Sequence, residues 1–420
     1  GYVSSGTAGT SGSIPVSGNP LNLGKFYGSA AAGLLWGSRF LRPGNYGTDF
    51  YIRYLNSRFF ICGGDQNKSA ITYSTDSTAT SWLTTSVENG PLWVPSGGPL
   101  NYYYPKVLDI AFDGTKYVAC GEFLGTASSS STLPNGVISY STDLVNWTTV
   151  STSTLPSGMV PKKIIWSPEK SLFIAVGNGN NGLYTSPDGI TWTARTTAAT
   201  QLYCILWNGF VFVAGGNNII IYSTDGINWT QSNGYGESGY TYSYNDVAWG
   251  NNIFVMGSGA TQAVWTSPNG VTWTKRTLPT TLNGQYSVSY GNSTFLIASY
   301  QGFYMTSPDG ITWTYRNATS TNGYGGTSIG GNSSLPKMFC FGASKFIGCG
   351  LGSVVSSVDA ISWNSLNTGS VNNLNSVASN GNVTVAVGDF SLNQFNTKTL
   401  KPTILSSVDG NNWNHSNRSE

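Results

Sequence analysis

General acid and base catalysis needs a carboxylate or imidazole of tuned pKa, and this chain of 420 residues offers few candidates. Its single histidine is His415, and seven of its eighteen acidic residues belong to a recurring turn phrase described below. Six other acids fall near the ends of expected strands: Asp65, Asp109, Asp113, Glu122, Asp246 and Asp389. Asp109 and Asp246 occupy similar places in their repeats, so paired-carboxylate hydrolysis stays an alternative. No phosphate loop, Ser/His/Asp set or metal-ligand cluster is recognisable, so we predict no catalytic residue, cofactor or metal.

Composition excludes several other classes of protein. Only 9% of residues are charged, and 20 basic against 18 acidic residues give a net charge of +2, which disfavours nucleic-acid binding. No apolar run reaches the roughly 18 residues that a membrane helix needs. The five cysteines show no close CxxC spacing and are expected to be buried small apolar residues. The first twenty residues lack the pattern of a signal peptide, which suggests a processed or trimmed chain.

An internal repeat dominates the sequence. A phrase such as YTSPDGITW or YSTDGINW returns eight times, and its closing tryptophans lie 37 to 65 residues apart: Trp82, Trp147, Trp192, Trp229, Trp273, Trp313, Trp363 and Trp413. This spacing is typical of propeller blades. We therefore expect an all-β protein whose residues 50–420 form a β-propeller of four-stranded antiparallel blades, eight in number or else seven, preceded by an extension at 1–49.

Upstream of each phrase lies an apolar strand that ends in an aromatic residue, then a polar turn, then a second apolar strand. The first aromatic position contains Tyr54, Phe112, Trp166, Trp207, Trp249, Tyr290 and Phe341. The second position is assigned to Phe60, Tyr117, Phe173, Phe212, Phe254, Phe295 and Phe346. Each unit thus predicts two antiparallel strands before the phrase and two around it.

The chemistry of the phrase predicts a turn. Its acidic or amide side chain can accept backbone N–H groups of the turn, and glycine supplies a positive φ, which suits a two-residue hairpin. The structural turn residues are Asp76, Asp143, Asp188, Asp225, Asn269, Asp309, Asp359 and Asp409. Leu144 and Ala360 stand where other units have glycine, and the first unit has two extra residues, so we expect those turns to be looser.

The phrase resembles the Asp-box of the bacterial neuraminidase repeat, Ser-x-Asp-x-Gly-x-Thr-Trp, and more closely the shortened Ser-x-Asp-Gly-x-x-Trp variant of secreted and phage-tail propellers. The resemblance spans residues 50–414 and implies that the box is a structural turn remote from any catalytic centre. A sialidase would need three arginines at its central opening. Arg195, Arg276 and Arg316 each follow a motif tryptophan by three residues, which places them on the outermost strand.

The long connections all belong to one face of the expected propeller, because second-to-third and blade-to-blade loops share a side. They cover 84–106, 122–136, 231–245, 316–335 and 389–402. These loops contain Tyr, Gly, Ser and Asn but little charge, a mixture suited to sugar stacking or a dry protein contact. The candidate ligand-binding residues are Trp93, Tyr102, Tyr103, Tyr104, Tyr235, Tyr240, Tyr242 and Tyr324.

Residues 1–20 are rich in Ser, Gly and Thr and could extend along a sheet edge, completing the last blade or adding a strand to a neighbour. The chain stops seven residues after Trp413, so the last blade is expected to have little material of its own for closure. We hypothesise a non-catalytic extracellular, cell-surface or virion protein: a subunit of a filament or phage tail fibre that self-associates through its N-terminal segment. A lectin-like glycan-binding module and a sialidase-like glycoside hydrolase are the alternatives.

Overall fold

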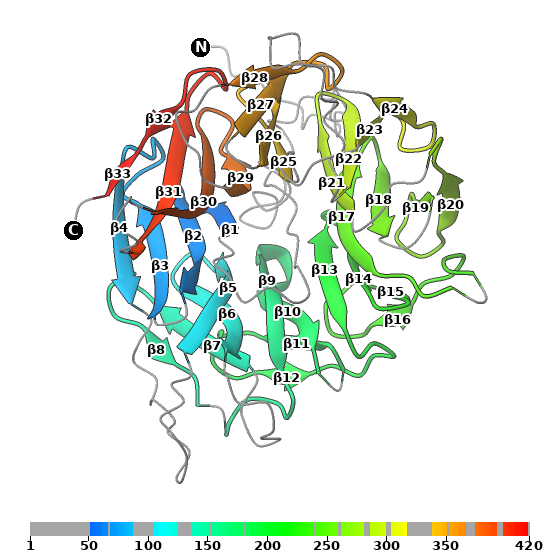
Figure 1. The fold of residues 1–420 in the computed structure, drawn as a ribbon. Coiled ribbons are helices and arrows are strands. Elements are labelled where there is room, and N and C mark those ends of the chain that lie inside the picture. Colours follow the sequence, from blue (N-terminus) through cyan, green and yellow to red (C-terminus); the bar gives the residue numbers. More distant parts are fainter. Residues whose placement is uncertain are drawn as a thin grey trace, which may run out of the picture.

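The protein is a ring of eight four-stranded antiparallel sheets, which confirms the predicted all-β propeller and its blade count. The computed structural model describes residues 51–418 except 66–67, 87–103, 125–135, 152, 180, 238–239, 259–261, 281–285, 300–303, 317–337, 351–352, 367–373 and 393–397. In Figure 1 the chain runs once around the ring, so that the red last blade meets the blue first blade.

Each blade consists of four consecutive strands. The first four blades are β1 (Tyr51–Leu55), β2 (Arg58–Asp65), β3 (Lys68–Ser74) and β4 (Ser81–Ser86); β5 (Tyr104–Phe112), β6 (Tyr117–Leu124), β7 (Gly136–Ser141) and β8 (Thr148–Thr149); β9 (Val160–Ser167), β10 (Leu172–Asn178), β11 (Leu183–Ser186) and β12 (Thr193–Ala194); and β13 (Leu202–Trp207), β14 (Phe212–Gly216), β15 (Ile219–Ser223) and β16 (Thr230–Gln231). A 3-10 turn, Pro168–Lys170, joins β9 to β10.

The other four blades repeat this order. They are β17 (Tyr244–Gly250), β18 (Ile253–Ser258), β19 (Ala263–Ser267) and β20 (Thr274–Thr277); β21 (Tyr286–Gly291), β22 (Thr294–Ser299), β23 (Tyr304–Ser307) and β24 (Thr314–Arg316); β25 (Met338–Gly342), β26 (Lys345–Gly350), β27 (Ser353–Ser357) and β28 (Asn364–Leu366); and β29 (Leu374–Ser379), β30 (Thr384–Leu392), β31 (Lys398–Ser407) and β32 (Asn414–His415). A last short strand, β33 (Asn417–Arg418), follows.

The first strand of each blade is innermost, because first strands of neighbouring blades contact one another, as β5 contacts β9 and β17 contacts β21. The apolar core lies between the sheets. One cluster, for example, joins Ile174 of the third blade to Trp207 and Phe212 of the fourth. Since both faces of most sheets are covered, their inner strands are nearly continuous apolar runs.

An aromatic pair closes the first hairpin of seven blades, as the two predicted aromatic positions require. The ring centroids lie 4.0 to 5.0 Å apart, as in Trp207 and Phe212 or Phe341 and Phe346. One assignment was wrong by a residue: Tyr54 pairs with Phe59 across β1 and β2, whereas Phe60 faces the second blade and contacts Tyr117. Because Phe59 and Phe60 are adjacent and equally apolar, the sequence leaves open which of them pairs with Tyr54. The strand register decides it, since successive residues of a strand point to opposite faces of the sheet.

The turn of the phrase is longer than the two-residue hairpin we expected. Residues 187–192 separate β11 from β12, and the same arrangement recurs around the ring. Leu144 and Ala360 do not loosen their turns. They adopt φ values of 65° and 57°, close to the 71° of Gly189, and are buried. The surrounding hydrogen bonds therefore impose the left-handed conformation even without glycine.

The last blade has its own four strands, which corrects the expectation that it lacks material for closure. Beyond it, β33 pairs in parallel with β4 of the first blade, Asn417 opposite Ser81. Ser416 Oγ also donates a hydrogen bond to the carbonyl oxygen of Ala79 at 3.2 Å. The two ends of the ring are thus joined at the rim by the C-terminal segment. The N-terminal segment 1–49 lies outside the described residues.

No helix in the described part of the chain is long and apolar enough to cross a membrane.

Candidate functional site

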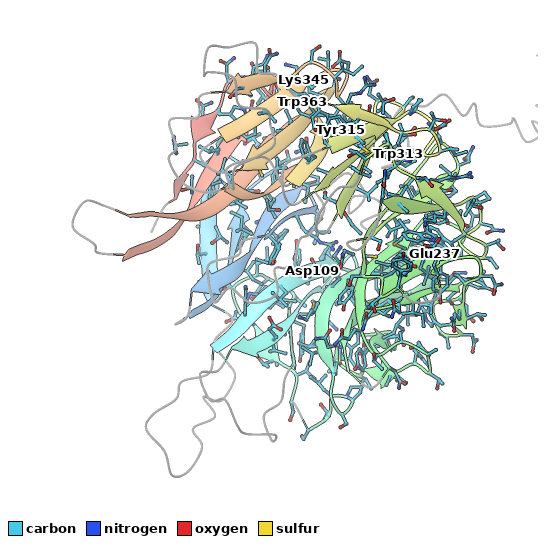
Figure 2. The ribbon with its side chains drawn as sticks, turned by 45° about the vertical axis from the view of Figure 1, so that its right-hand side comes forward. Asp109, Glu237, Trp313, Tyr315, Lys345 and Trp363 are labelled. Atoms are coloured by element: carbon cyan, nitrogen blue, oxygen red, sulfur yellow. The ribbon has the colours of Figure 1, made fainter. Side chains whose placement is uncertain are left out.

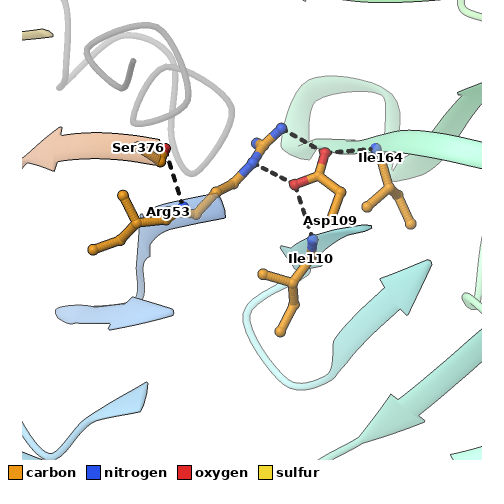
Figure 3. Close-up of polar contacts among 6 residues, drawn as sticks. Arg53, Asp109, Ile110, Ile164 and Ser376 are labelled. Carbon is orange, nitrogen blue, oxygen red and sulfur yellow. Dashed lines mark hydrogen bonds and ion pairs between the residues drawn. The ribbon is translucent and has the colours of Figure 1, made fainter. Parts of the chain in front are cut away.

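Toward the centre of the ring, Asp109 forms an ion pair with Arg53. The Asp109 carboxylate accepts hydrogen bonds from Arg53 Nη2 at 2.7 Å, Ile110 N at 3.0 Å and Ile164 N at 3.0 Å, and lies 2.6 Å from Arg53 Nε. Figure 3 shows these contacts. Only 3% of the Asp109 side chain is exposed, against 18% for Arg53. One carboxylate therefore joins the inner strands of three successive blades.

The same repeat position makes the same kind of link elsewhere. Asp246 accepts hydrogen bonds from Val247 N at 3.1 Å and from Val288 N of the next blade at 3.0 Å. Ser376 Oγ accepts one from Ile52 N at 3.4 Å, which closes the ring between its last and first blades. Cys204 Sγ lies 3.5 Å from the carbonyl oxygen of Tyr244 and donates to it.

A local irregularity positions these four side chains. The strand register shifts immediately before each of them, between Val107/Asp109, Leu202/Cys204, Tyr244/Asp246 and Leu374/Ser376. A bulge re-aims the residue that follows it. Here the bulge turns a polar or thiol side chain toward the backbone of the adjacent blade. The sequence signal was the matching place of Asp109 and Asp246, but their bonding across blades was not foreseen.

The acids of this inner arrangement are engaged by the backbone. Both carboxylate oxygens of Asp109 and of Asp246 accept backbone N–H groups, and these bonds hold the inner strands together. In Figure 2 Asp109 lies toward the middle of the ring, whereas Glu237 lies toward its outer side. Among the described residues, no three His, Cys, Asp or Glu side chains gather closely enough to hold a metal ion.

The predicted turn residues form one hydrogen-bond network repeated around the ring. In the third blade Asp188 Oδ1 accepts N–H groups of Ile190 at 2.8 Å and Thr191 at 2.7 Å, and Ser186 Oγ donates to it at 2.9 Å. Trp192 Nε1 donates to the carbonyl oxygen of Gly189 at 3.2 Å. Asp143, Asp225, Asn269, Asp309, Asp359 and Asp409 accept the equivalent bonds, and Asp76 accepts one backbone bond from Thr78.

These bonds stabilise the carboxylate form of the turn aspartates. For Asp188 partial burial acts to raise the pKa, but hydrogen bonds from the backbone N–H groups of Thr191 and Ile190 bring the pKa below its ordinary value of 3.8. For Asp143 the backbone and side-chain bonds from Asn146 lower the pKa. The turns therefore keep a negative charge at every pH near neutrality.

The box turns also join neighbouring blades, through bonds from the first-to-second strand turn of the preceding blade. Lys116 Nζ donates to the carbonyl oxygen of Asp188 at 2.7 Å, and Lys345 Nζ to that of Asp409 at 2.9 Å. Asn292 donates to Val358 and Asn380 to Ser77 in the same manner. These bonds place both kinds of turn on one side of the disc, which we call the turn face. The opposite side, where second-to-third and blade-to-blade connections lie, is the loop face.

The candidate ligand-binding tyrosines differ in their exposure to solvent. Tyr240 is 60% exposed, but Tyr242 is 1% exposed and donates to Glu237 Oε2 at 2.8 Å, so Tyr242 packs in the core and offers no stacking surface. Tyr235 is half-buried against the same core. Tyr104 begins strand β5. Trp93, Tyr102, Tyr103 and Tyr324 lie outside the described residues.

The loop from 231 to 245 is fastened to the fifth blade. Lys275 Nζ lies 2.7 Å from Glu237 Oε1, and this bond, with the one from Tyr242, lowers the pKa of Glu237. Asn233 N donates to the carbonyl oxygen of Val271 at 2.8 Å, and Trp273 N to that of Asn233 at 2.8 Å. The described parts of this loop, 231–237 and 240–245, are therefore held against the fifth blade.

The arginines and cysteines occupy structural positions. Arg276 and Arg316 lie on outermost strands and Arg195 directly follows one, and each donates its Nε to a threonine of the neighbouring strand, at 2.6 Å for Arg195 and Thr185. All five cysteines are buried and free, as expected. Burial raises the pKa of the Cys204 thiol to about 12, which makes it unreactive.

The fold and this inner ring define the chain as an eight-bladed β-propeller. The profile of one family, described as the DUF6242 beta propeller domain, matches residues 101–239. The comparison with curated proteins found no match.

Several solved structures are similar to this chain at low sequence identity. The computationally designed Ika8 protein has 11% identity and a TM-score of 0.52, covering 82% of this chain and 94% of that one. Virginiamycin B lyase from Staphylococcus aureus has 12% identity and a TM-score of 0.49, covering 74% and 94%. YCF48 from Cyanidioschyzon merolae has 12% identity and a TM-score of 0.45, covering 74% and 95%. At such identities the likeness extends to the fold alone.

Proposed function

We propose that this chain is a non-catalytic extracellular propeller that works by surface contact, as a repeating subunit or adhesive part of a surface filament or phage tail fibre. One observation carries the proposal. Of the nine large apolar side chains that the described residues leave exposed, seven lie in turns of the turn face: Val145, Phe210, Ile227, Ile311, Val358, Ile361 and Val408. That most of the exposed apolar groups belong to one face supports a contact through that face.

The engagement of the acids supports a structural role over a catalytic one. Asp109 and Asp246, the two carboxylates suggested for a hydrolase, each bridge two backbone N–H groups. A general acid or nucleophile must instead reach a bound substrate. The three arginines that a sialidase would need at its centre are at the rim in this chain.

We infer that the recurring turn is the shortened Asp-box of secreted and phage-tail propellers. The Ser of the phrase donates to the Asp or Asn side chain in seven blades. The Trp donates its Nε1 to a carbonyl oxygen of the turn in the first six blades. Membership of that group favours a location outside the cell, at a cell surface or on a virion.

Self-association is the first property to test, and the predicted donor is residues 1–20, whose apolar core is Ile14 and Val16. The purified full chain is examined by electron microscopy, beside a variant with Ile14→Asp and Val16→Asp. We expect filaments from the parent chain and shorter or no filaments from the variant. A parent chain that stays monomeric and cleaves glycosides would overturn the proposal.

A lectin-like module is the second candidate, because Tyr240 exposes most of its ring beside the ordered ring of Tyr242, 6.1 Å away between centroids. An exposed tyrosine on an anchored loop can stack on a sugar. Binding to a glycan array that is lost with Tyr240→Ala but kept with Leu83→Ala, at the rim, would favour this function.

A further inference from the structure

We propose that the outer edge of strand β4 accepts a strand from a neighbouring copy of this chain, formed by residues 14–16 of that copy. This inference rests on the proposed function, in which residues 1–20 are the donor, and it assigns the acceptor. β4 is the outermost of the first blade's own four strands, and β33 lies beyond it in Figure 1. The acceptor is the part of this edge that continues past β33.

β4 differs from the fourth strands of the other blades in its length. It has six residues, whereas β8, β12, β16, β20, β24, β28 and β32 have two to four. A sheet edge offers unpaired N–H and C=O groups to another chain, and a very short edge strand offers few of them. Among these described strands, β4 therefore presents the longest outer edge.

β4 also lacks the charges that protect sheet edges. Its sequence, SWLTTS, contains no basic or acidic residue. Strand β20, the next longest of the set, contains Lys275 and Arg276, and β24 contains Arg316. Charged side chains on an edge strand oppose pairing with another chain. Residues 1–20 are uncharged as well, so donor and acceptor can pair without burying a charge of their own.

The outer edge of β4 already accepts one strand. β33 pairs in parallel with its first two residues, Ser81 and Trp82. Beyond Trp82, no described strand pairs with this edge. The next two residues, Leu83 and Thr84, are exposed, and the exposed fraction of Leu83 is 40%. A further strand in line with β33 would therefore find both an open backbone edge and an apolar side chain.

The backbone of Thr84 faces outward. The carbonyl oxygen of Ser81 accepts a hydrogen bond from Thr75 N, directly after β3, at 3.0 Å. Because the backbone groups of successive residues point to opposite sides of a strand, Leu83 and Thr85 also face β3. Thr84 lies between them and directs its N–H and C=O groups away from β3. It thus offers one donor and one acceptor to an added strand.

The sequence Ile14, Pro15 and Val16 suits an added outermost strand. Proline has no N–H group, so it fits a strand only where that side faces solvent. With Pro15 directed outward, the backbone groups of Ile14 and Val16 face β4. The side chains of Ile14 and Val16 share one face of the strand, and they cover Leu83 when that face is the one on which Leu83 lies.

The test is disulfide cross-linking between two full-length chains. One chain has Val16→Cys, and the other, which also has an affinity tag, has Leu83→Cys. They are mixed and oxidised with diamide, and a third chain has both substitutions. The native cysteines are buried and are poor competitors. The parent chain is followed by sedimentation velocity over a concentration series, and circular dichroism verifies that every variant folds.

Two proline variants make the test specific to the edge. Thr84→Pro removes the outward N–H group of β4 and leaves its bonds to β3. Ala194→Pro is the matched control, because Ala194 follows the motif tryptophan of the third blade by two residues, as Thr84 does in the first. Each is introduced into the tagged chain and into the parent chain.

We expect disulfide-linked dimers that contain one chain of each kind. Thr84→Pro should lower their yield by about tenfold or more, because the added strand loses hydrogen bonds to the edge. Ala194→Pro should leave the yield unchanged. In sedimentation velocity the parent chain should form oligomers, and Thr84→Pro should raise the concentration at which they form by a similar factor.

Three outcomes would overturn the inference. If the chain with both cysteines forms only an internal disulfide, residues 14–16 complete their own blade. If the parent chain forms oligomers but no mixed dimer appears and Thr84→Pro has no effect, the donor uses another acceptor, and the proposed function survives. If the folded parent chain is monomeric at every concentration and no mixed dimer appears, the self-association in the proposed function fails together with this acceptor.

Discussion

At the scale of single residues, the position that glycine fills in most turns shows how strongly the turn network constrains the backbone. Leu144 and Ala360 adopt positive φ values that side chains with a Cβ rarely take. Each is surrounded by the same bonds as its glycine counterparts, for instance from Ile361 N and Ser362 N to Asp359 Oδ1 at 2.8 Å. Leu144 and Ala360 share this backbone conformation but differ in the size of the side chain that they pack in the core. Substitutions at the two positions therefore distinguish the effect of backbone strain from the effect of side-chain packing.

Replacing these residues by glycine should have opposite effects. Ala360→Gly relieves the left-handed strain and is expected to stabilise the fold by up to about 1 kcal/mol. Leu144→Gly relieves the same strain but removes a side chain packed in the core of the first two blades, a net loss of about 2 kcal/mol or more. Guanidinium unfolding midpoints of both variants measure the difference, and equal shifts in one direction would contradict this account.

Asn269 is the one amide among the eight turn positions, and it makes slightly longer bonds. Its Oδ1 accepts Thr272 N at 3.1 Å, where Asp225 accepts Asn228 N at 2.8 Å. Because a carboxylate is the stronger acceptor, Asn269→Asp should stabilise the protein by about 0.5 to 1 kcal/mol. The reverse change Asp225→Asn is the matched control and should destabilise it. Thermal melting at pH 7 tests the pair; a loss of stability with Asn269→Asp would speak against the charge argument.

At the scale of elements, the bulged inner strands connect neighbouring blades through hydrogen bonds. Asp109 holds Arg53 of the preceding blade and Ile164 N of the following one, so its removal leaves a charge and two amides without their acceptor. Sheets that meet only through apolar side chains could slide past each other. A bulge followed by a residue with a short hydrogen-bond-accepting side chain fixes the position of one sheet relative to its neighbour.

Asp109→Ala is therefore expected to destabilise the propeller by about 3 to 5 kcal/mol. Asp246→Ala, which orphans two amides and no arginine, should destabilise it by about 1 to 3 kcal/mol. Urea unfolding of both variants gives the comparison. An Asp109 variant as stable as the parent would show that solvent replaces the carboxylate.

The second element that joins blades is the C-terminal segment 416–418, which we call the C-terminal clasp. Ending the chain after His415 removes β33 and the bond from Ser416 to Ala79. We expect this shorter chain to fold, because Ser376, Asn380 and the apolar core between the last and first blades still close the ring. Its stability should fall by about 1 to 2 kcal/mol, for two or three lost hydrogen bonds. Hydrogen exchange at β4 would rise selectively, and an unchanged β4 would refute the role of the clasp.

At the scale of the whole molecule, the turn aspartates make stability depend on acid pH. Their pKa values are lower in the folded chain than the ordinary 3.8, as for Asp309 and Asp359, where hydrogen bonds from turn amides outweigh partial burial. A group with a lowered pKa stabilises the fold at pH above its unfolded value, and this contribution is lost as pH falls through the folded value.

Unfolding midpoints should consequently be flat from neutral pH down to about pH 4 and then fall steeply. The turns are distributed around the ring, so all blades weaken together and the transition should stay cooperative. Equilibrium denaturation between pH 7 and pH 2 tests this window. Asp188→Asn should flatten part of the acid slope, and a parent profile that declines already above pH 5 would contradict it.

Much of the fold was predictable because it is periodic. The turn phrase, the closing tryptophans and the aromatic pairs are local patterns. Because the phrase occurs eight times, the strand order and the number of blades could be predicted from it.

Two predictions made from the turn phrase itself were wrong, namely its two-residue length and the looser turns at Leu144 and Ala360. The other failures concern features on which the repeat is silent. Phe59 and Phe60 are equally apolar in sequence, and the burial of Tyr242 depends on Glu237 and the core of the fifth blade.

The sequence by itself determined the all-β class, the blade repeat and the turn chemistry, since each depends on residues within one short segment. Tertiary structure alone decided the rest. It brought Arg53 to Asp109 across 56 positions and Ser376 to Ile52 across 324. It also gathered the acids and exposed apolar residues of separate turns on one face. Closing a ring sets which distant segments meet, and no local pattern contains that geometry.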